Sequence, residues 1–186
     1  IAREKWILRA LERVTDRTDA YPDLPVLAQR DSVPYLGGSL RVQYAACNSR
    51  KGRWSLDEPA GLLRVELPDP TSDSWRIGAL QSFEKQRTQE LVQEYLRQYL
   101  PLFAERGVAA PAAVRFRIMQ SRWGSCSGRT HSLSFNARLC ERPHAFIEYV
   151  VVHELCHFLH GNHSADFWRE VERYLPDWQA RRKLGD

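Results

Sequence analysis

The sequence YVVVHELCHFLHGNHSADFW, residues 149–168, decides the interpretation of the whole chain. After an apolar run it contains His153-Glu154-Leu155-Cys156-His157, which has the pattern HExxH. Residues four apart lie on one face of an α-helix, so the imidazoles of His153 and His157 can bind a single metal ion. Glu154 lies beside the first histidine, where its carboxylate can reach a water on the metal. The pattern therefore predicts a zinc site in which the pKa of the water falls to about 7 and Glu154 takes its proton.

An apolar helix is expected around this motif. Pro143 suits its first turn, residues 146–159 supply a broad apolar face, and Gly161 is expected to end it in a left-handed cap. Ser164 is expected to cap the helix that follows. Cys156 points away from the face of the two histidines, which favours a small buried thiol over a metal ligand.

A catalytic zinc site needs a third protein ligand. His160 would lie about 10 Å along the axis from the first histidine if the helix continued, too far to share one ion. His163 follows Gly161, where a turn can bring it back over the site, so we expect His163 to be the ligand and His160 to lie at the rim. Glu170 and Glu172 on the next helix remain alternatives as a carboxylate ligand.

A chance occurrence of HExxH on an amphipathic helix is the competing interpretation. In that case the histidines would be ordinary polar or core residues. Four of the six histidines of the chain lie within the eleven residues from His153 to His163, and this concentration favours the metal site.

Local patterns predict the other elements. Helical spacing of apolar residues predicts helices over residues 1–14 and 77–100, with Pro101 ending or kinking the second. Alternating patterns predict strands over residues 39–45 and 62–67, joined as a hairpin with a long loop. Two more strands, residues 113–120 and 132–139, are expected to form an antiparallel pair around the loop 121–130.

The stretch LPDPTSDS, residues 67–74, is the best linker in the chain. It divides the chain into a helix and β-hairpin region over residues 1–74 and a metallohydrolase domain over residues 75–186. The chain begins at Ile1 rather than Met, so we expect a fragment or a processed form.

Composition limits the class of protein. The 186 residues carry a net charge of +4 and a pI of about 9.0, which would tolerate a nucleotide or nucleic acid partner but also fits an arginine-rich surface without one. The four cysteines form no CxxC pair, which argues against a zinc knuckle. No signal peptide or membrane-length apolar run is recognised, so we expect a cytoplasmic protein with free thiols and no membrane partner.

Several segments together resemble one known family. The resemblance is strong over residues 111–183 and weaker upstream, and it rests on SRWGSC (121–126), NARL (136–139), YVVVHELCHFLHGNHSADFW (149–168) and LPDW (175–178), with VPYLGG (33–38) and EKWILR (4–9). These resemble the YgjP-like metallopeptidase domain, often described as an M48-type metal-dependent hydrolase and related to SprT-like and WLM domains. The resemblance implies an α+β, zincin-like fold, with a small mixed or antiparallel sheet packed on the HExxH helix. It also implies zinc on His153, His157 and His163, with Glu154 catalytic.

Three functions follow as hypotheses. The first is a zinc metallopeptidase acting on a peptide or protein, in which zinc-bound water activated by Glu154 attacks the peptide carbonyl. The second, which the resemblance allows, is a UTP-type nucleoside triphosphate pyrophosphatase at the same site, although the chain has no GxxxxGK[ST] loop. The third is a non-catalytic, nucleic-acid-associated module that uses the basic segment 181–183.

The loop around Arg122 has two interpretations. Arg122 can face a carbonyl oxyanion or a phosphate, or it can be a salt-bridge partner beside a core Trp123 and a turn at Gly124. The predicted strand 132–139 can also offer its edge to an extended peptide.

Overall fold

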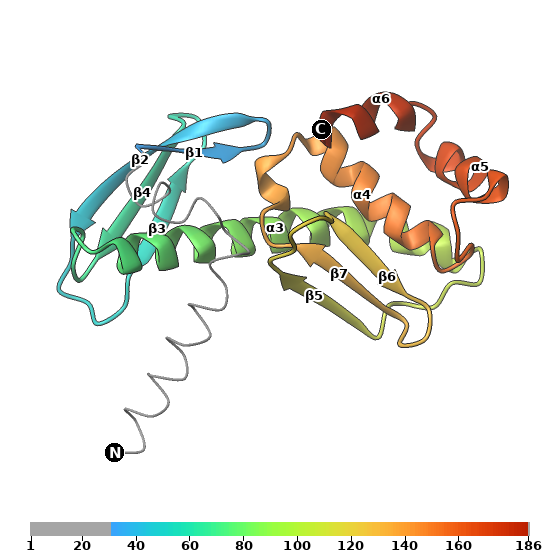
Figure 1. The fold of residues 1–186 in the computed structure, drawn as a ribbon, viewed down its shortest axis with the longest axis horizontal. Coiled ribbons are helices and arrows are strands. Elements are labelled where there is room, and N and C mark those ends of the chain that lie inside the picture. Colours follow the sequence, from blue (N-terminus) through green and yellow to red (C-terminus); the bar gives the residue numbers. More distant parts are fainter. Residues whose placement is uncertain (1–30, 186) are drawn as a thin grey trace, which may run out of the picture.

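A computed structural model describes residues 31–185, in which two small sheets lie toward the two ends of one long helix (Figure 1). The helix predicted over residues 1–14 lies outside the described residues. The first sheet contains β1 (Ser32–Tyr35), β2 (Gly38–Ala46), β3 (Arg53–Asp57) and β4 (Leu62–Leu67), in the order β1-β2-β4-β3. The second contains β5 (Ala113–Arg117), β6 (Gly124–Ser127) and β7 (Ser132–Asn136), in the order β5-β7-β6.

The hairpin predicted between residues 39–45 and 62–67 is wrong. The two strands are neighbours, but they run parallel, with Val42 opposite Leu63. The intervening residues form β3, which pairs antiparallel with β4, so the chain reverses direction twice between the two predicted strands. The hairpins are instead β1–β2 and β3–β4.

The long helix α3 (Asp73–Ala104) joins the two sheets. Near its start Phe83 is fully buried and contacts the rings of Tyr35 and Trp54 from the first sheet. Near its end Phe103 stacks on Tyr174 with ring centroids 4.5 Å apart. The helix continues to Ala104, so Pro101 does not end it, because this buried aromatic contact stabilises the last turn.

The antiparallel pairing predicted between residues 113–120 and 132–139 is also wrong. β5 and β7 are parallel, because the loop predicted between them contains β6, which pairs antiparallel with β7. This places β7 in the centre of the sheet. Leu133 and Phe135 of β7 are fully buried on one face, and Ser132, Ser134 and Asn136 alternate with them.

One helix of the C-terminal part packs against this sheet, and two more pack against that helix. They are α4 (His144–Cys156), α5 (Ala165–Tyr174) and α6 (Trp178–Arg182), with short 3-10 turns η2 (Leu139–Glu141) and η3 (Lys183–Gly185). α4 contacts both β6 and α3, so the sheet, α4 and the long helix share one core. The predicted α+β class, with a small mixed sheet packed on the HExxH helix, is confirmed.

The ends of α4 and α5 depend on local geometry. Ser164 caps α5 as predicted, because its side chain accepts a hydrogen bond from the backbone N–H of Phe167 at 3.4 Å. The left-handed cap predicted at Gly161 is wrong: α4 ends at Cys156, and tight turns through Leu159 and His160 follow it. No helix in the described part of the chain combines the length and apolarity needed to cross a membrane.

Candidate metal centre

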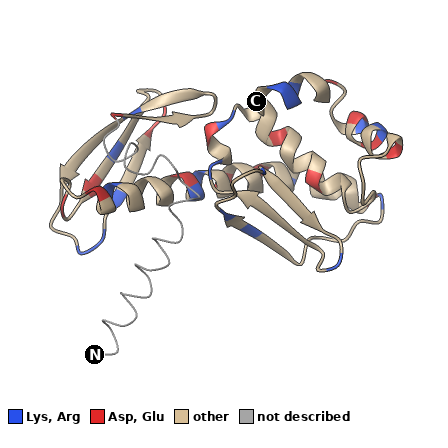
Figure 2. Ribbon diagram, viewed as in Figure 1, with Lys and Arg blue, Asp and Glu red and all other residues tan. Residues whose placement is uncertain are grey.

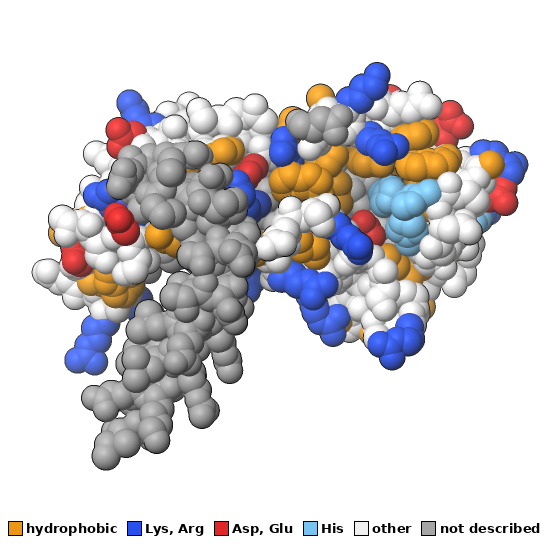
Figure 3. Space-filling view, in the orientation of Figure 1, with side chains coloured by type: hydrophobic (Ala, Val, Ile, Leu, Met, Phe, Trp, Pro, Cys, Tyr) orange, Lys and Arg blue, Asp and Glu red, His pale blue; other side chains and the backbone are white. Residues whose placement is uncertain are grey.

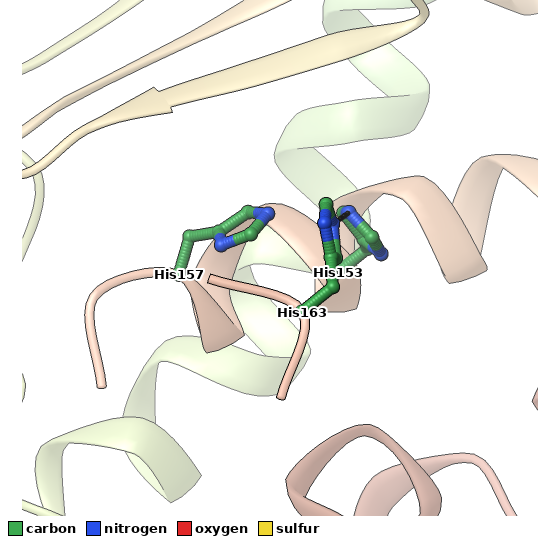
Figure 4. Close-up of side chains that lie close together, drawn as sticks. All are labelled: His153, His157 and His163. Carbon is green, nitrogen blue, oxygen red and sulfur yellow. Dashed lines mark hydrogen bonds between the residues drawn. The ribbon is translucent and has the colours of Figure 1, made fainter. Parts of the chain in front are cut away.

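Three imidazoles converge beside the end of α4 (Figure 4). His153 lies on the last turns of α4, His157 is its C-terminal cap residue, and His163 comes from the loop before α5. One ring nitrogen from each lies within 4.8 Å of the others, and the Nε2 atoms of His153 and His163 are 3.0 Å apart. Two nitrogen ligands of one tetrahedral zinc ion lie about 3.4 Å apart, given Zn–N distances of about 2.1 Å. The donor set therefore fits a zinc-type ion after small adjustments.

Neighbouring groups orient two of these rings. Nδ1 of His157 lies 3.1 Å from the backbone carbonyl oxygen of His160. Because a carbonyl can only accept a hydrogen bond, Nδ1 carries the proton and the lone pair of Nε2 is left for a metal. Nδ1 of His153 lies 3.3 Å from the hydroxyl of Tyr149. His160 thus contributes a backbone carbonyl, and its imidazole lies outside the cluster.

Burial favours the neutral form of two of the imidazoles, those of His153 and His157. Burial, together with the charges that His157 and His163 would carry, lowers the pKa of His153 to about 3. Burial also lowers the pKa of His157. A histidine binds a metal through a neutral ring, so these side chains are in the form that can coordinate at pH 7.

Phe167 forms the floor of the cluster. Its ring is fully buried, and its centroid lies 4.9 Å, 4.6 Å and 4.8 Å from those of His153, His157 and His163. The sequence places Phe167 on the apolar stripe of α5, and the structure adds this contact with all three imidazoles. Its contact with each ring limits how far the three can separate.

Glu154 lies on the other side of His153, against the start of β6. Its side chain is buried, and burial raises its pKa to about 8, while the positive charge of Arg122 opposes the rise. A Cβ atom on Gly124 would lie 2.7 Å from both Cγ and Oε1 of Glu154. Gly124 is the first residue of β6 and not a turn residue. Because it has no side chain, it leaves room for the carboxylate of Glu154.

Asn136 holds the loop that carries Arg122. Its Nδ2 donates hydrogen bonds to the backbone carbonyl oxygens of Met119 and Arg122, at 2.8 Å and 3.0 Å. Its backbone N–H donates to the carbonyl oxygen of Trp123. Sequence reasoning gave Asn136 no role of its own. The sequence cue to its role was that the NARL and RWGSC segments occur together, and these hydrogen bonds connect the two segments.

Two hollows meet at Gly124, His153 and Glu154. The smaller, of about 260 Å³, is walled largely by aromatic side chains and also reaches Arg182; its walls include Trp123, Phe146 and Tyr149. The larger, of about 550 Å³, contains the three histidines together with Arg122 and the strand β6. Figure 3 shows the histidine surface in the C-terminal part of the molecule, with hydrophobic atoms and separate basic groups around it.

The other candidates from the sequence lie elsewhere. Glu170 is buried away from the cluster and is within ion-pair distance of Arg106, at 3.4 Å, and of Arg173, at 3.6 Å. Glu172 is exposed and is not part of the histidine group. Cys156 is fully buried and unpaired, as predicted for an apolar thiol.

The chain is similar to known proteins. A family model described as "YgjP-like, metallopeptidase domain" matches residues 1–184. Among solved structures, the metallopeptidase zymogen of Pyrococcus abyssi abylysin matches with 21% sequence identity and a TM-score of 0.40, covering 52% of this chain and 87% of that chain. No curated protein matches the chain.

Proposed function

The chain belongs to the YgjP-like metallopeptidase family, and on that premise we propose that it is a zinc-dependent peptidase with its metal on His153, His157 and His163. The family makes it a metal-dependent hydrolase of the peptidase type. The observation that carries the finer proposal is the convergence of three imidazoles next to the buried carboxylate of Glu154. Three protein nitrogens leave a fourth position open, which is the arrangement of catalytic rather than structural zinc.

Glu154 is proposed as the general base and then the general acid. When bound, zinc supplies a Lewis acid that polarises the peptide carbonyl and lowers the pKa of a coordinated water to about 7. Burial favours the neutral form of Glu154, and the positive charge of a bound zinc ion would oppose this as Arg122 does, favouring the ionised carboxylate. That carboxylate accepts a proton from the water as the water oxygen attacks the carbonyl carbon. It then donates that proton to the amide nitrogen as the C–N bond breaks, so that one water is consumed and a new carboxyl and a new amine are formed.

An extended peptide has a strand edge available beside the centre. The prediction that residues 132–139 offer this edge is wrong, because β7 is bonded on both sides. The edge strand next to α4 is β6, and Gly124, Ser125 and Cys126 line the larger hollow with the histidines. A peptide bound by strand addition to β6 would carry its main chain past Glu154.

Nucleoside triphosphate hydrolysis at the same site is the second candidate. Arg122 favours it, because this exposed cation lines the larger hollow and could contact a phosphate. Among the described residues, however, the histidine cluster is the one group suited to a metal, so no set of carboxylates for magnesium accompanies it. A nucleic-acid-associated role has less support, because Arg181 of the basic segment pairs with Glu148 and Asp177.

Metal analysis and turnover on the same samples test the proposal. We expect one zinc per wild-type chain, its loss in His163→Ala, and cleavage in a broad peptide library. Glu154→Gln is the matched variant: it should keep zinc and lose turnover, since its amide cannot accept the proton. Zinc-loaded wild type that cleaves no peptide, or Glu154→Gln that cleaves as well as wild type, would contradict the proposal, and pyrophosphate release from a nucleotide panel would favour the second candidate.

A further inference from the structure

The segment that builds the C-terminal sheet carries no acidic residue. Between Glu105 and Glu141 the sequence contains arginines but neither Asp nor Glu. Figure 2 shows the consequence: in this sheet basic positions occur on β5 and in the connecting loops, and the acidic ones of the molecule lie on the helices and the first sheet. A positive potential is therefore expected along this wall of the catalytic cleft.

Four arginines of this segment have no acidic partner among residues 31–185. Arg115, Arg117, Arg122 and Arg129 are exposed, and none of them forms an ion pair with any other described residue. Several arginines elsewhere are paired, as Arg87 is with Glu58, although Arg64 of the first sheet is exposed and forms no ion pair with another described residue. Of these four unpaired charges, Arg122 lines the larger hollow, whereas Arg115 and Arg117 lie on β5 at the opposite edge of the sheet.

Two of the four bracket the edge strand. Arg122 lies two residues before Gly124, where β6 begins, and Arg129 lies two residues after Ser127, where it ends. Arg122 lines the larger hollow, and its charge acts on Glu154. Arg129 lies in the turn between β6 and β7. One edge of β6 is bonded to β7, so its opposite edge is the one that a peptide could pair with.

The cleft itself offers these cations almost no internal counter-charge. Among the described residues that line either hollow, Glu154 is the one carboxylate, and the smaller hollow contributes a further cation, Arg182. An anionic ligand would therefore meet complementary charge, and a cationic ligand would be repelled.

We propose that the cleft selects acidic peptides, with one Asp or Glu side chain near the cleaved bond bound by Arg122 and a second bound by Arg129. This inference rests on the proposed peptidase function. The four residues of β6 span about 10 Å, and a peptide paired with them is equally extended. Because Arg122 and Arg129 lie just beyond the two ends of β6, the two acidic positions of the peptide should lie about three to six residues apart. The free edge of β6 favours a peptide over a polynucleotide, because its N–H and C=O groups match a peptide main chain and not a phosphodiester chain.

Matched peptides test the inference with the zinc-loaded full chain. Pairs that differ only by Glu or Gln at one position are compared by kcat/KM. In wild type we expect the Glu peptide to be cleaved about two to five times faster at the favoured positions, with the ratio falling toward one in high salt, as for an exposed charge pair. Arg122→Gln should remove the preference near the cleaved bond, and Arg129→Gln the preference at the distal position.

Two further variants distinguish a local charge contact from an effect of net charge. Arg129→Glu should reverse the distal preference, so that a Lys peptide is cleaved faster than its Glu counterpart. Arg64→Gln is the control, because Arg64 is an exposed residue of β4 in the other sheet, and its loss changes the net charge equally. It should leave the Glu-to-Gln ratio unchanged.

The outcomes separate this inference from the proposed function. Equal cleavage of Glu and Gln peptides by wild type, or an equal loss of preference in Arg64→Gln, would overturn the acidic selectivity while the peptidase stands. Tight, salt-sensitive competition by an oligonucleotide, without any preference for acidic peptides, would assign the arginines to nucleic acid and overturn it as well. Absence of all peptide cleavage would instead remove the proposed function.

Discussion

The imidazole of His163 lies stacked on the indole of Trp168, with ring centroids 5.5 Å apart and planes inclined by 20°. Trp168 in turn stacks on Trp178 at 4.2 Å, and the guanidinium of Arg182 lies 5.7 Å from the Trp168 ring. The imidazole that comes from a loop is thus held by side chains of α5 and α6. This packing removes rotamer freedom that metal binding would otherwise have to restrict.

Replacement of Trp168 should weaken metal binding. We expect Trp168→Leu to lower zinc affinity about tenfold, in the range found when groups that orient ligands are removed, and Trp168→Phe to lower it less. Competition with a chromophoric chelator measures this without relying on activity. Trp75→Leu is the control, since Trp75 lies on α3 and is 38% exposed. Unchanged affinity in Trp168→Leu would show that the stack has no part in positioning His163.

Enlargement of Gly124 should impair chemistry while leaving the metal in place. In Gly124→Ala the new methyl group would lie 2.7 Å from the Glu154 carboxylate and displace it. A displacement of about 1 Å in a catalytic group can cost about a hundredfold in rate, so we expect a loss of that order in kcat. Zinc content and the unfolding midpoint should change little, because a flexible side-chain end can move.

Gly78→Ala provides the matched control for that substitution. Gly78 lies on α3, and a methyl group added there would meet no atom within 4 Å beyond its own stretch of helix, so the replacement should not change kcat. If Gly124→Ala is as active as Gly78→Ala, the close approach of Gly124 to Glu154 is not required for catalysis.

The local part of the site could be predicted from the sequence. His153 and His157 share a face because of the helical repeat, and His163 follows a turn short enough to return it to that face. The contact of Gly124 with Glu154 could not be predicted in the same way, because it joins a strand and a helix about thirty residues apart in the chain. It depends on how β6 packs against α4, which no local pattern specifies.

Strand direction was the main feature that local patterns missed. The alternation in residues 113–117 and 132–136 correctly indicates strands, but alternation is the same for parallel and antiparallel neighbours. The decisive element is β6, a four-residue strand of small side chains, GSCS, without the β-branched or aromatic residues that mark strands. Missing it inverted the predicted pairing and assigned the free edge to the wrong strand.

Removal of the Asn136 side chain should destabilise the fold. Asn136→Ala would leave the carbonyl oxygens of Met119 and Arg122 without their amide donor at a position only 5% exposed. Unsatisfied buried groups of this kind cost about 1–3 kcal/mol, so we expect unfolding free energy to fall by about 2 kcal/mol in urea titration. Gln43→Ala, on the first sheet, should cost less than about 0.5 kcal/mol. Equal effects of the two substitutions would show that these hydrogen bonds do not secure the loop.

Removal of metal should lower stability through the same three histidines. A ligand that binds only the folded state stabilises it by about 4 kcal/mol when its free concentration is about a thousand times its dissociation constant. We therefore expect a chelator to lower the thermal midpoint of the wild type by several degrees, and zinc to restore it. His163→Ala should melt near the chelated wild type and respond weakly to either reagent, because two imidazoles bind zinc less well than three. Glu154→Gln should respond as wild type does, since its side chain is not proposed as a ligand. A wild-type midpoint that is insensitive to both chelator and zinc would mean that the converging imidazoles of His153, His157 and His163 do not hold a metal in the folded protein.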